Sequence, residues 1–148
     1  RVPWGILLLF GGGLSLANAF ATSGLTEWLG AQLTGLRGVP LPLVLAATAA
    51  LFVFLTELTS NTATAALGMP LMVGVAHGLD MAALPLMITT ALAASMAFML
   101  PVATPPNAIV FGSGRIRPFQ MARAGFWLNL LSITLISLWM WLRFPASV

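Results

Sequence analysis

The sequence predicts an all-α integral membrane protein whose transmembrane helices include one re-entrant helical hairpin and one discontinuous helix. Hydrophobic residues make up 59% of the 148 residues and charged residues only 6%, whereas soluble domains carry roughly 25% charged residues. Two polar, helix-breaking stretches interrupt this apolar sequence, ELTSNTATAA at residues 57–66 and ATPPN at residues 103–107. Non-helical backbone at membrane depth is tolerated only where protein buries it or where it lines a cavity. The two breaks are therefore predicted to form two walls of one small-ligand site.

Composition excludes several classes of function. The net charge is +3, but the basic residues are arginines scattered between apolar runs, which is typical of topology signals and not of a nucleic-acid partner. The absence of cysteine excludes disulfides, a thiolate nucleophile and a cysteine-type zinc site. A single histidine argues against a soft-metal site, whereas hard cations bound by oxygen stay open. Because the chain begins at Arg1 and not at Met, we expect a piece of a longer protein.

Residues 1–37 are predicted to form a transmembrane helix followed by an interfacial helix, on the scaffold side of the protein. Residues 4–21 are uncharged and long enough to cross a bilayer. Glycines 11–13 favour close approach of a neighbouring helix, with a hinge or ligand contact as the alternative. Residues 22–36 fit an amphipathic helix in the membrane interface, with Trp28 as an anchor, although a continuation of the first span is also possible.

Residues 38–80 are predicted to form a re-entrant hairpin with a Ser-Asn-Thr tip near mid-membrane. Helices over residues 41–56 and 63–76 would be about 24 Å and 21 Å long, short of the ~30 Å hydrocarbon core. Two full spans joined by an external polar turn are the alternative. His77 is expected in a solvated loop. Glu57 is expected to be a structural carboxylate satisfied by neighbouring donors, although it could instead attract a cation or repel the substrate.

Residues 81–148 are predicted to hold a discontinuous transmembrane helix and a final transmembrane helix, on the transport side. Residues 81–102 are apolar, and the two prolines of the ATPPN stretch then remove donors and disfavour helix. A shorter apolar piece follows at residues 108–114, which is the pattern of broken helices at transporter binding sites; a proline kink is the alternative. A basic loop with Arg115, Arg117 and Arg123 precedes a final span over residues 126–142.

The arginines predict the orientation of a multi-pass protein in the cell (inner) membrane. The expected crossings put four of them on one face and two on the other, and the richer face is assigned to the cytoplasm. The first group is Arg1, Arg115, Arg117 and Arg123, and the second is Arg37 and Arg143. The hairpin would then enter from outside, and the C-terminus would be outside or periplasmic.

The unfinished helix ends suggest what the two breaks bind. The helix N-terminus after the tip attracts anions. Unpaired carbonyls at the C-terminal end of residues 41–56, together with threonine and asparagine oxygens, suit a small hard cation such as Na⁺. The second break would add carbonyls near Ala103 and donors from Thr104 and Asn107. A cation and an anion bound side by side reduce each other's desolvation penalty, and this coupling of their binding is the thermodynamic basis of symport.

Two motifs resemble those of the divalent anion/sodium symporter family, the sodium-coupled di- and tricarboxylate transporters. Ser60, Asn61 and Thr62 resemble the family's Ser-Asn-Thr motif, and ATPPNAIVFGSG at residues 103–114 resembles its second signature. Residues 4–13 also resemble the corresponding part of the family. The resemblance covers nearly the whole chain but only the C-terminal half of such a transporter.

The resemblance implies a fold, partners and site residues. It implies one of two inverted repeats in a lipid-embedded homodimer that works by an elevator motion, with the N-terminal half of the same transporter supplying the other tip. It implies a carboxylate site at Ser60, Asn61, Thr62, Thr104 and Pro105. It implies a Na⁺ site at Thr56, Thr59, Asn61 and Ala103.

The leading hypothesis is the C-terminal half of a secondary active transporter that symports Na⁺ with a di- or tricarboxylate of the succinate, malate, fumarate or citrate type. A sulfate or other divalent-anion carrier, or an anion exchanger of the same fold, is the main alternative. A non-transporting or channel-like membrane subunit is another. An intramembrane hydrolase using Ser60, His77 and Asp80 fails on distance, because a helical arm separates Ser60 from His77 by roughly 20 Å, against the ~3 Å that proton transfer needs.

Overall fold

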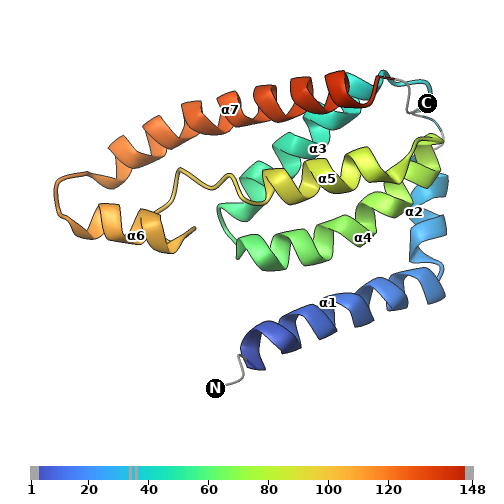
Figure 1. The fold of residues 1–148 in the computed structure, drawn as a ribbon, viewed down its shortest axis with the longest axis horizontal. Helices are drawn as coiled ribbons and strands as arrows, with labels where there is room; N and C mark the ends of the chain where they lie inside the picture. The colour runs from blue at the N-terminus through green and yellow to red at the C-terminus, as the bar shows by residue number, and fades with distance from the viewer. Residues whose placement is uncertain (1–3, 34, 36, 146–148) are drawn as a thin grey trace.

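The computed structural model describes residues 4–33, 35 and 37–145. These residues form helices joined by short loops and contain no strand, which confirms the all-α prediction for the part described (Figure 1). The helices are α1 (Trp4–Thr22), α2 (Leu25–Leu33), α3 (Leu41–Thr56), α4 (Asn61–Leu79), α5 (Ala83–Ala93), α6 (Pro105–Gly112) and α7 (Pro118–Arg143). Arg1, whose position entered the orientation argument, lies outside the described residues.

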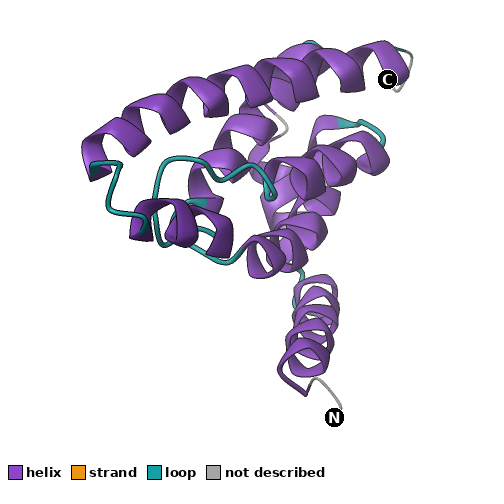
Figure 2. Cartoon of the chain, turned by 60° about the vertical axis from the view of Figure 1, so that its left-hand side comes forward, coloured by secondary structure: helices purple, strands orange, loops and turns teal. Residues whose placement is uncertain are grey.

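The core lies around α3 and α5. Helix α5 packs against both α3 and α4, which contact each other little, so the two arms of the expected hairpin are joined at the tip and separated by α5 (Figure 1). Leu45, Ala49 and Val53 of α3 are fully buried. Helix α7 packs along α3, and α2 packs against α4. Helix α1 projects from the rest of the bundle and meets it through α4 and α2 (Figure 2).

Small residues let α1 approach α4 at one point. A Cβ added at Gly13 would lie 3.2 Å from the Ala66 Cβ, whereas Gly11 and Gly12 have nothing within 4 Å. The predicted role of these glycines in close helix packing is therefore confirmed for Gly13 alone.

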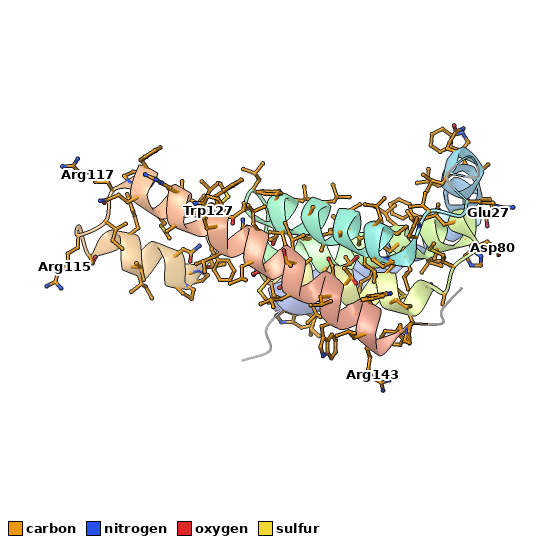
Figure 3. The ribbon with its side chains drawn as sticks, turned by 90° about the horizontal axis from the view of Figure 1, so that it is seen from above. Glu27, Asp80, Arg115, Arg117, Trp127 and Arg143 are labelled. Atoms are coloured by element: carbon orange, nitrogen blue, oxygen red, sulfur yellow. The ribbon has the colours of Figure 1, made fainter. Side chains whose placement is uncertain are left out.

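Charged side chains gather at the two ends of the long axis. Arg115 and Arg117 lie at one end, and Glu27 and Asp80 lie at the other (Figure 3). Arg37 belongs to the second end, because its Nε donates to the carbonyl of Gly78 at 3.2 Å. Within the described residues, α4 and α7 are long and apolar enough to cross a membrane. Charged side chains at the two ends, with the buried Glu57 as the exception between them, are compatible with a bilayer around the middle.

Helix α4 is longer than the sequence predicted. It runs over 19 residues, roughly 28 Å at 1.5 Å per residue, whereas we expected helix only over residues 63–76. It begins earlier because Ser60 caps it, and it ends later because Asp80 takes the left-handed conformation (φ 59°). His77 and Gly78 therefore belong to the last turn and not to a loop, although His77 is exposed as expected.

Two other boundaries also differ from the prediction. Helix α5 ends at Ala93 and α6 begins at Pro105, so the break covers residues 94–104, whereas we expected it at residues 103–107. Helix α7 begins at Pro118, where proline needs no helical acceptor, and the Gln120 side chain accepts from the N–H of Arg117 at 2.9 Å. Arg123 therefore lies in α7 and not in a basic loop.

At Gly68 of α4, side chains from α3 and α5 pack directly against the backbone. A Cβ there would lie 2.3 Å from Phe52 Cε1 and 2.8 Å from Thr90 Cγ2, and both of these side chains are buried. Gly68→Ala is expected to destabilise the protein by about 1–3 kcal/mol through overpacking, despite the better helix propensity of alanine. Thermal unfolding of the purified full-length protein in detergent measures this. Gly5→Ala is the control, since a Cβ at Gly5 meets nothing within 4 Å; equal melting temperatures for the two variants would contradict the prediction.

A candidate anion and cation site at two helix breaks

The first break separates α3 from α4. Ser60 is extended (φ −70°, ψ 134°) and its Oγ accepts from the Ala63 N–H at 3.3 Å, as an N-cap does. Its carbonyl accepts from the Thr64 N–H at 2.8 Å, which starts the helical ladder. The N–H groups of Asn61 and Thr62 precede the first helical donor, Thr64, and have no carbonyl four residues earlier in the helix, so they lie free at the positive end of α4.

Three oxygens meet behind the tip. Thr56 Oγ1 lies 2.7 Å from Asn61 Oδ1 and 2.7 Å from the carbonyl oxygen of Ala94. A hydroxyl carries one proton, so it donates to only one of the two acceptors at a time. Thr56 is fully buried. The result is a buried group of neutral oxygens with more lone pairs than protons.

The second break is the loop from Ala94 to Thr104. Thr104 caps α6 by accepting from the Asn107 N–H at 3.3 Å. The next two residues are prolines, which have no N–H. Asn107 was expected to donate to a ligand, but its Nδ2 donates to the carbonyls of Ala97 at 2.9 Å and Leu100 at 3.0 Å. The N-terminus of α6 therefore offers far fewer donors than that of α4.

Glu57 links the two breaks. Its carboxylate accepts from the N–H groups of Phe98 at 2.7 Å, Met99 at 2.9 Å and Leu100 at 3.1 Å, and from Asn129 Nδ2 at 2.8 Å. The residue is 4% exposed. The prediction that Glu57 is a structural carboxylate satisfied by neighbouring donors is confirmed. The identity of those donors, over forty residues away, gave no signal in the sequence.

The two breaks line one pocket of about 560 Å³, within the range usual for small-molecule sites. All the residues predicted to bind carboxylate lie in its wall, together with Ala103 from the predicted cation set. The lining residues are Ser60, Asn61, Thr62, Ser95, Ala97, Phe98, Ala103, Thr104, Pro105, Pro106 and Asn107. The expectation that the two breaks form two walls of one site therefore agrees with the geometry.

The predicted cation residues do not all converge. Thr56 lies behind Asn61, and Thr59 is turned away, because its hydroxyl donates to the Leu55 carbonyl at 3.0 Å and pairs with Thr64. The carbonyl of Ala94 completes the oxygen group instead. Sequence reasoning missed it, together with Ser95, Ala97 and Phe98, because that segment was expected to be helical.

The side chains that line the pocket are uncharged. Glu57 is fully engaged with its four donors. The described residues contain no cluster of three or more His, Cys, Asp or Glu side chains. A cation here would rely on hydroxyl, amide and carbonyl oxygens, and the group at Thr56 Oγ1, Asn61 Oδ1 and the Ala94 carbonyl suits a small hard ion such as Na⁺. An anion would rely on the donors of residues 60–62 and on the positive end of α4.

The chain is similar to known membrane transporters. A model of the sodium:sulfate symporter transmembrane region matches residues 1–144. The sodium-dependent dicarboxylate transporter SdcS of Staphylococcus saprophyticus subsp. saprophyticus is 51% identical over 145 residues, which are 97% of this chain and 28% of that relative. The protein of the same name from Staphylococcus aureus strain USA300 is 49% identical over 138 residues, which are 93% of this chain and 26% of that relative.

The chain thus spans about a quarter of the length of these relatives. The names of the family and of the relatives are those of transporters and not of enzymes, and they confirm the resemblance that the two motifs indicated. Since the family model covers almost every residue, the chain belongs to the sodium:sulfate symporter family of membrane proteins.

Proposed function

We propose that this chain is part of the C-terminal half of a transporter that moves a di- or tricarboxylate together with Na⁺. The observation that carries the proposal is the pocket in which an unfinished helix N-terminus and a neutral oxygen group meet at Asn61. The relatives are named sodium-dependent dicarboxylate transporters, which supports a dicarboxylate of the succinate, malate or fumarate type as the substrate; a tricarboxylate such as citrate is the further possibility in the proposal. The other half of the pocket would come from the remainder of the longer protein.

We assign the carboxylate to the tip and to the start of α6. Ser60, Asn61 and Thr62 would donate to the anion, and Thr104 and Pro105 would lie beside it. Helix N-termini hold anions without a charged side chain, so no Arg or Lys is required in an apolar setting where it would be costly.

We assign Na⁺ to the oxygens behind the tip. Thr56 and Asn61 would ligate it through side chains, and the main chain near Ala103 and Thr59 would add oxygens, with the Ala94 carbonyl as a further donor. Because Asn61 would face both ligands, binding of the cation would favour binding of the anion.

Thr56→Val tests the cation assignment. Valine keeps the shape of threonine and removes the oxygen, so the Na⁺ concentration for half-maximal uptake is expected to rise about tenfold or more, the equivalent of roughly 1.4 kcal/mol. Uptake by the complete transporter is measured against Na⁺ concentration. Thr134→Val is the matched control, since Thr134 is exposed and bonds only within α7. An unchanged Na⁺ dependence in Thr56→Val would remove Thr56 from the site.

We further propose a re-entrant hairpin in an elevator-type homodimer, with the C-terminus outside. The proposal of a hairpin is supported by the hydrogen bond that Asn129 donates to Glu57. This bond holds the tip beside the middle of the 26-residue α7. If α7 crosses the bilayer, the tip then lies near mid-depth. The opposite placement of Arg115 and Arg117 relative to Arg37 supports the orientation.

Uptake by the complete protein in proteoliposomes tests the function. Radiolabelled succinate is expected to enter in a saturable manner that requires an inward Na⁺ gradient. Unlabelled sulfate is the competitor of interest, because the family name includes it: inhibition by sulfate and not by malate or citrate would favour a sulfate carrier. Non-saturating flux would indicate a channel, and the absence of any Na⁺-dependent uptake would refute the proposal.

A further inference from the structure

Glu57 is bonded both to the loop that forms one pocket wall and to α7. We propose that Glu57, Gly125 and Asn129 form a clamp that fixes the loop of residues 94–104 against both the hairpin tip and α7. In this clamp all three act as positioning residues, since they set the separation of the two pocket walls without themselves lining the pocket.

Two electrostatic costs oppose a charged Glu57 at this position. A carboxylate at the C-terminal end of α3 faces the negative end of the helix dipole, and burial adds a desolvation cost. Three successive N–H groups, from Phe98, Met99 and Leu100, offset both costs by converging on it. Such a run of N–H groups is an anion-binding nest, and here the anion is supplied by the protein itself.

This capture accompanies the early end of α5, where Pro101 also disfavours helix in the residues before it. In a continuous helix, the N–H groups of residues 98–100 would donate to the carbonyls four residues earlier, at residues 94–96. With those N–H groups bonded to Glu57, the Ala94 carbonyl is left to accept from Thr56 Oγ1 at 2.7 Å. The carboxylate thus releases an oxygen to the group to which we assign Na⁺, so the clamp bears on the cation as well as on the anion.

Helix α7 supplies the third side of the clamp. Asn129, which is fully buried, donates to Glu57 Oε1 at 2.8 Å. Gly125 lies one turn earlier on the same face of α7. A Cβ on Gly125 would lie 2.3 Å from the carbonyl oxygen of Phe98 and 2.6 Å from Met99 Cα. Because both of those atoms are backbone, no rotamer change would relieve the clash, and any side chain at Gly125 would push the loop away.

Hydrogen–deuterium exchange of the full-length protein in detergent tests the clamp without requiring transport. Glu57→Gln is expected to speed exchange of the amides at residues 98–100 by about tenfold or more, since it removes charge-assisted bonds, and to leave the amides of α7 unchanged. Glu27→Gln is the control, because Glu27 is an exposed carboxylate far from the loop. Unchanged exchange at residues 98–100 in Glu57→Gln would overturn the proposal.

A swap of the two side chains tests direct contact between Glu57 and Asn129. Asn129→Asp places two carboxylates together and is expected to be the most damaging single change. The double variant Glu57→Gln with Asn129→Asp restores one amide–carboxylate bond, so its exchange rate at residues 98–100 is expected to be at least about tenfold slower than independent effects would give. If the effects of the two substitutions on exchange at residues 98–100 simply add, direct contact between the two side chains is refuted.

Two variants on α7 provide a second test if Glu57→Gln does not fold. Asn129→Ala and Gly125→Ala leave the carboxylate in place and are expected to speed exchange in the same loop, whereas Gly5→Ala is expected to do nothing. If neither variant changes amide exchange at residues 98–100, the role of α7 is refuted.

The effect on uptake rests on the proposed function. There, the clamp variants are expected to raise the half-saturating concentrations of succinate and Na⁺ more than they lower the maximal rate. Faster loop exchange in a protein that takes up no succinate would support the clamp and refute the proposed function. Normal loop exchange in an active transporter would refute the clamp alone.

Discussion

Replacing Asn61 by alanine is expected to abolish sodium-dependent carboxylate uptake by the complete protein. The Asn61 side chain lines the pocket, and its Oδ1 lies 2.7 Å from Thr56 Oγ1 in the buried oxygen group. In our proposal it contacts both ligands, so the substitution removes one cation ligand and one anion donor. Hydrogen bonds to charged groups are worth about 1.5–3 kcal/mol each, so the loss is expected to be roughly 100-fold or more.

The matched control is Asn18→Ala, because Asn18 is an exposed asparagine on α1, outside the pocket. Initial rates of succinate uptake at several Na⁺ concentrations are compared for the two variants, with the amount of inserted protein measured in each. Asn61→Ala is expected to impair the dependence on both succinate and Na⁺. Normal sodium-dependent uptake in Asn61→Ala would remove the site assignment altogether.

The second large effect is expected for Asn107→Leu, through the shape of the pocket and the stability of the protein. Asn107 Nδ2 donates to the carbonyls of Ala97 and Leu100. Leucine removes both bonds. The Leu100 carbonyl keeps the N–H of Ala103 at 3.2 Å, whereas the Ala97 carbonyl loses its donor. At about 1–3 kcal/mol for an unsatisfied buried group, we expect a loss of roughly 1–3 kcal/mol and a fall in uptake of at least about tenfold.

Thermal unfolding in detergent and uptake in proteoliposomes are measured on the same preparation. Asn18→Leu introduces the same chemical change at an exposed site and is expected to have little effect. If Asn107→Leu unfolds at the wild-type temperature and transports at the wild-type rate, the loop does not depend on this side chain.

The parts of the fold that depend on local sequence could be predicted. The expected helix over residues 41–56 coincides with α3, because Pro40 and Pro42 mark its start and a polar tip follows its end. The first helix ends within one residue of the expected position. The caps of α4 and α6 are provided by Ser60 and Thr104 in the two stretches that were singled out. Caps and prolines act over three or four residues, so sequence reveals them.

The extent of the second break was not predicted, because part of what holds it lies elsewhere in the chain. Pro101 was a local signal against helix in the residues before it, but nothing local indicated that Glu57 accepts from the N–H groups of residues 98–100. The sequence also gave no means of seeing that Thr59 bonds to the Leu55 carbonyl and Asn107 to the loop. Where several polar side chains compete for partners, tertiary contacts decide which remain available to a ligand.

The paired prolines at the start of α6 make the two sides of the pocket unequal. Residues 105 and 106 have no hydrogen to offer, and Thr104 already occupies the next N–H, that of Asn107. Each proline ring also fixes its own φ, so the backbone at this surface can adjust little to a larger ligand. In the proposed transporter, the α6 side of the pocket would therefore discriminate between acids of equal charge by their width.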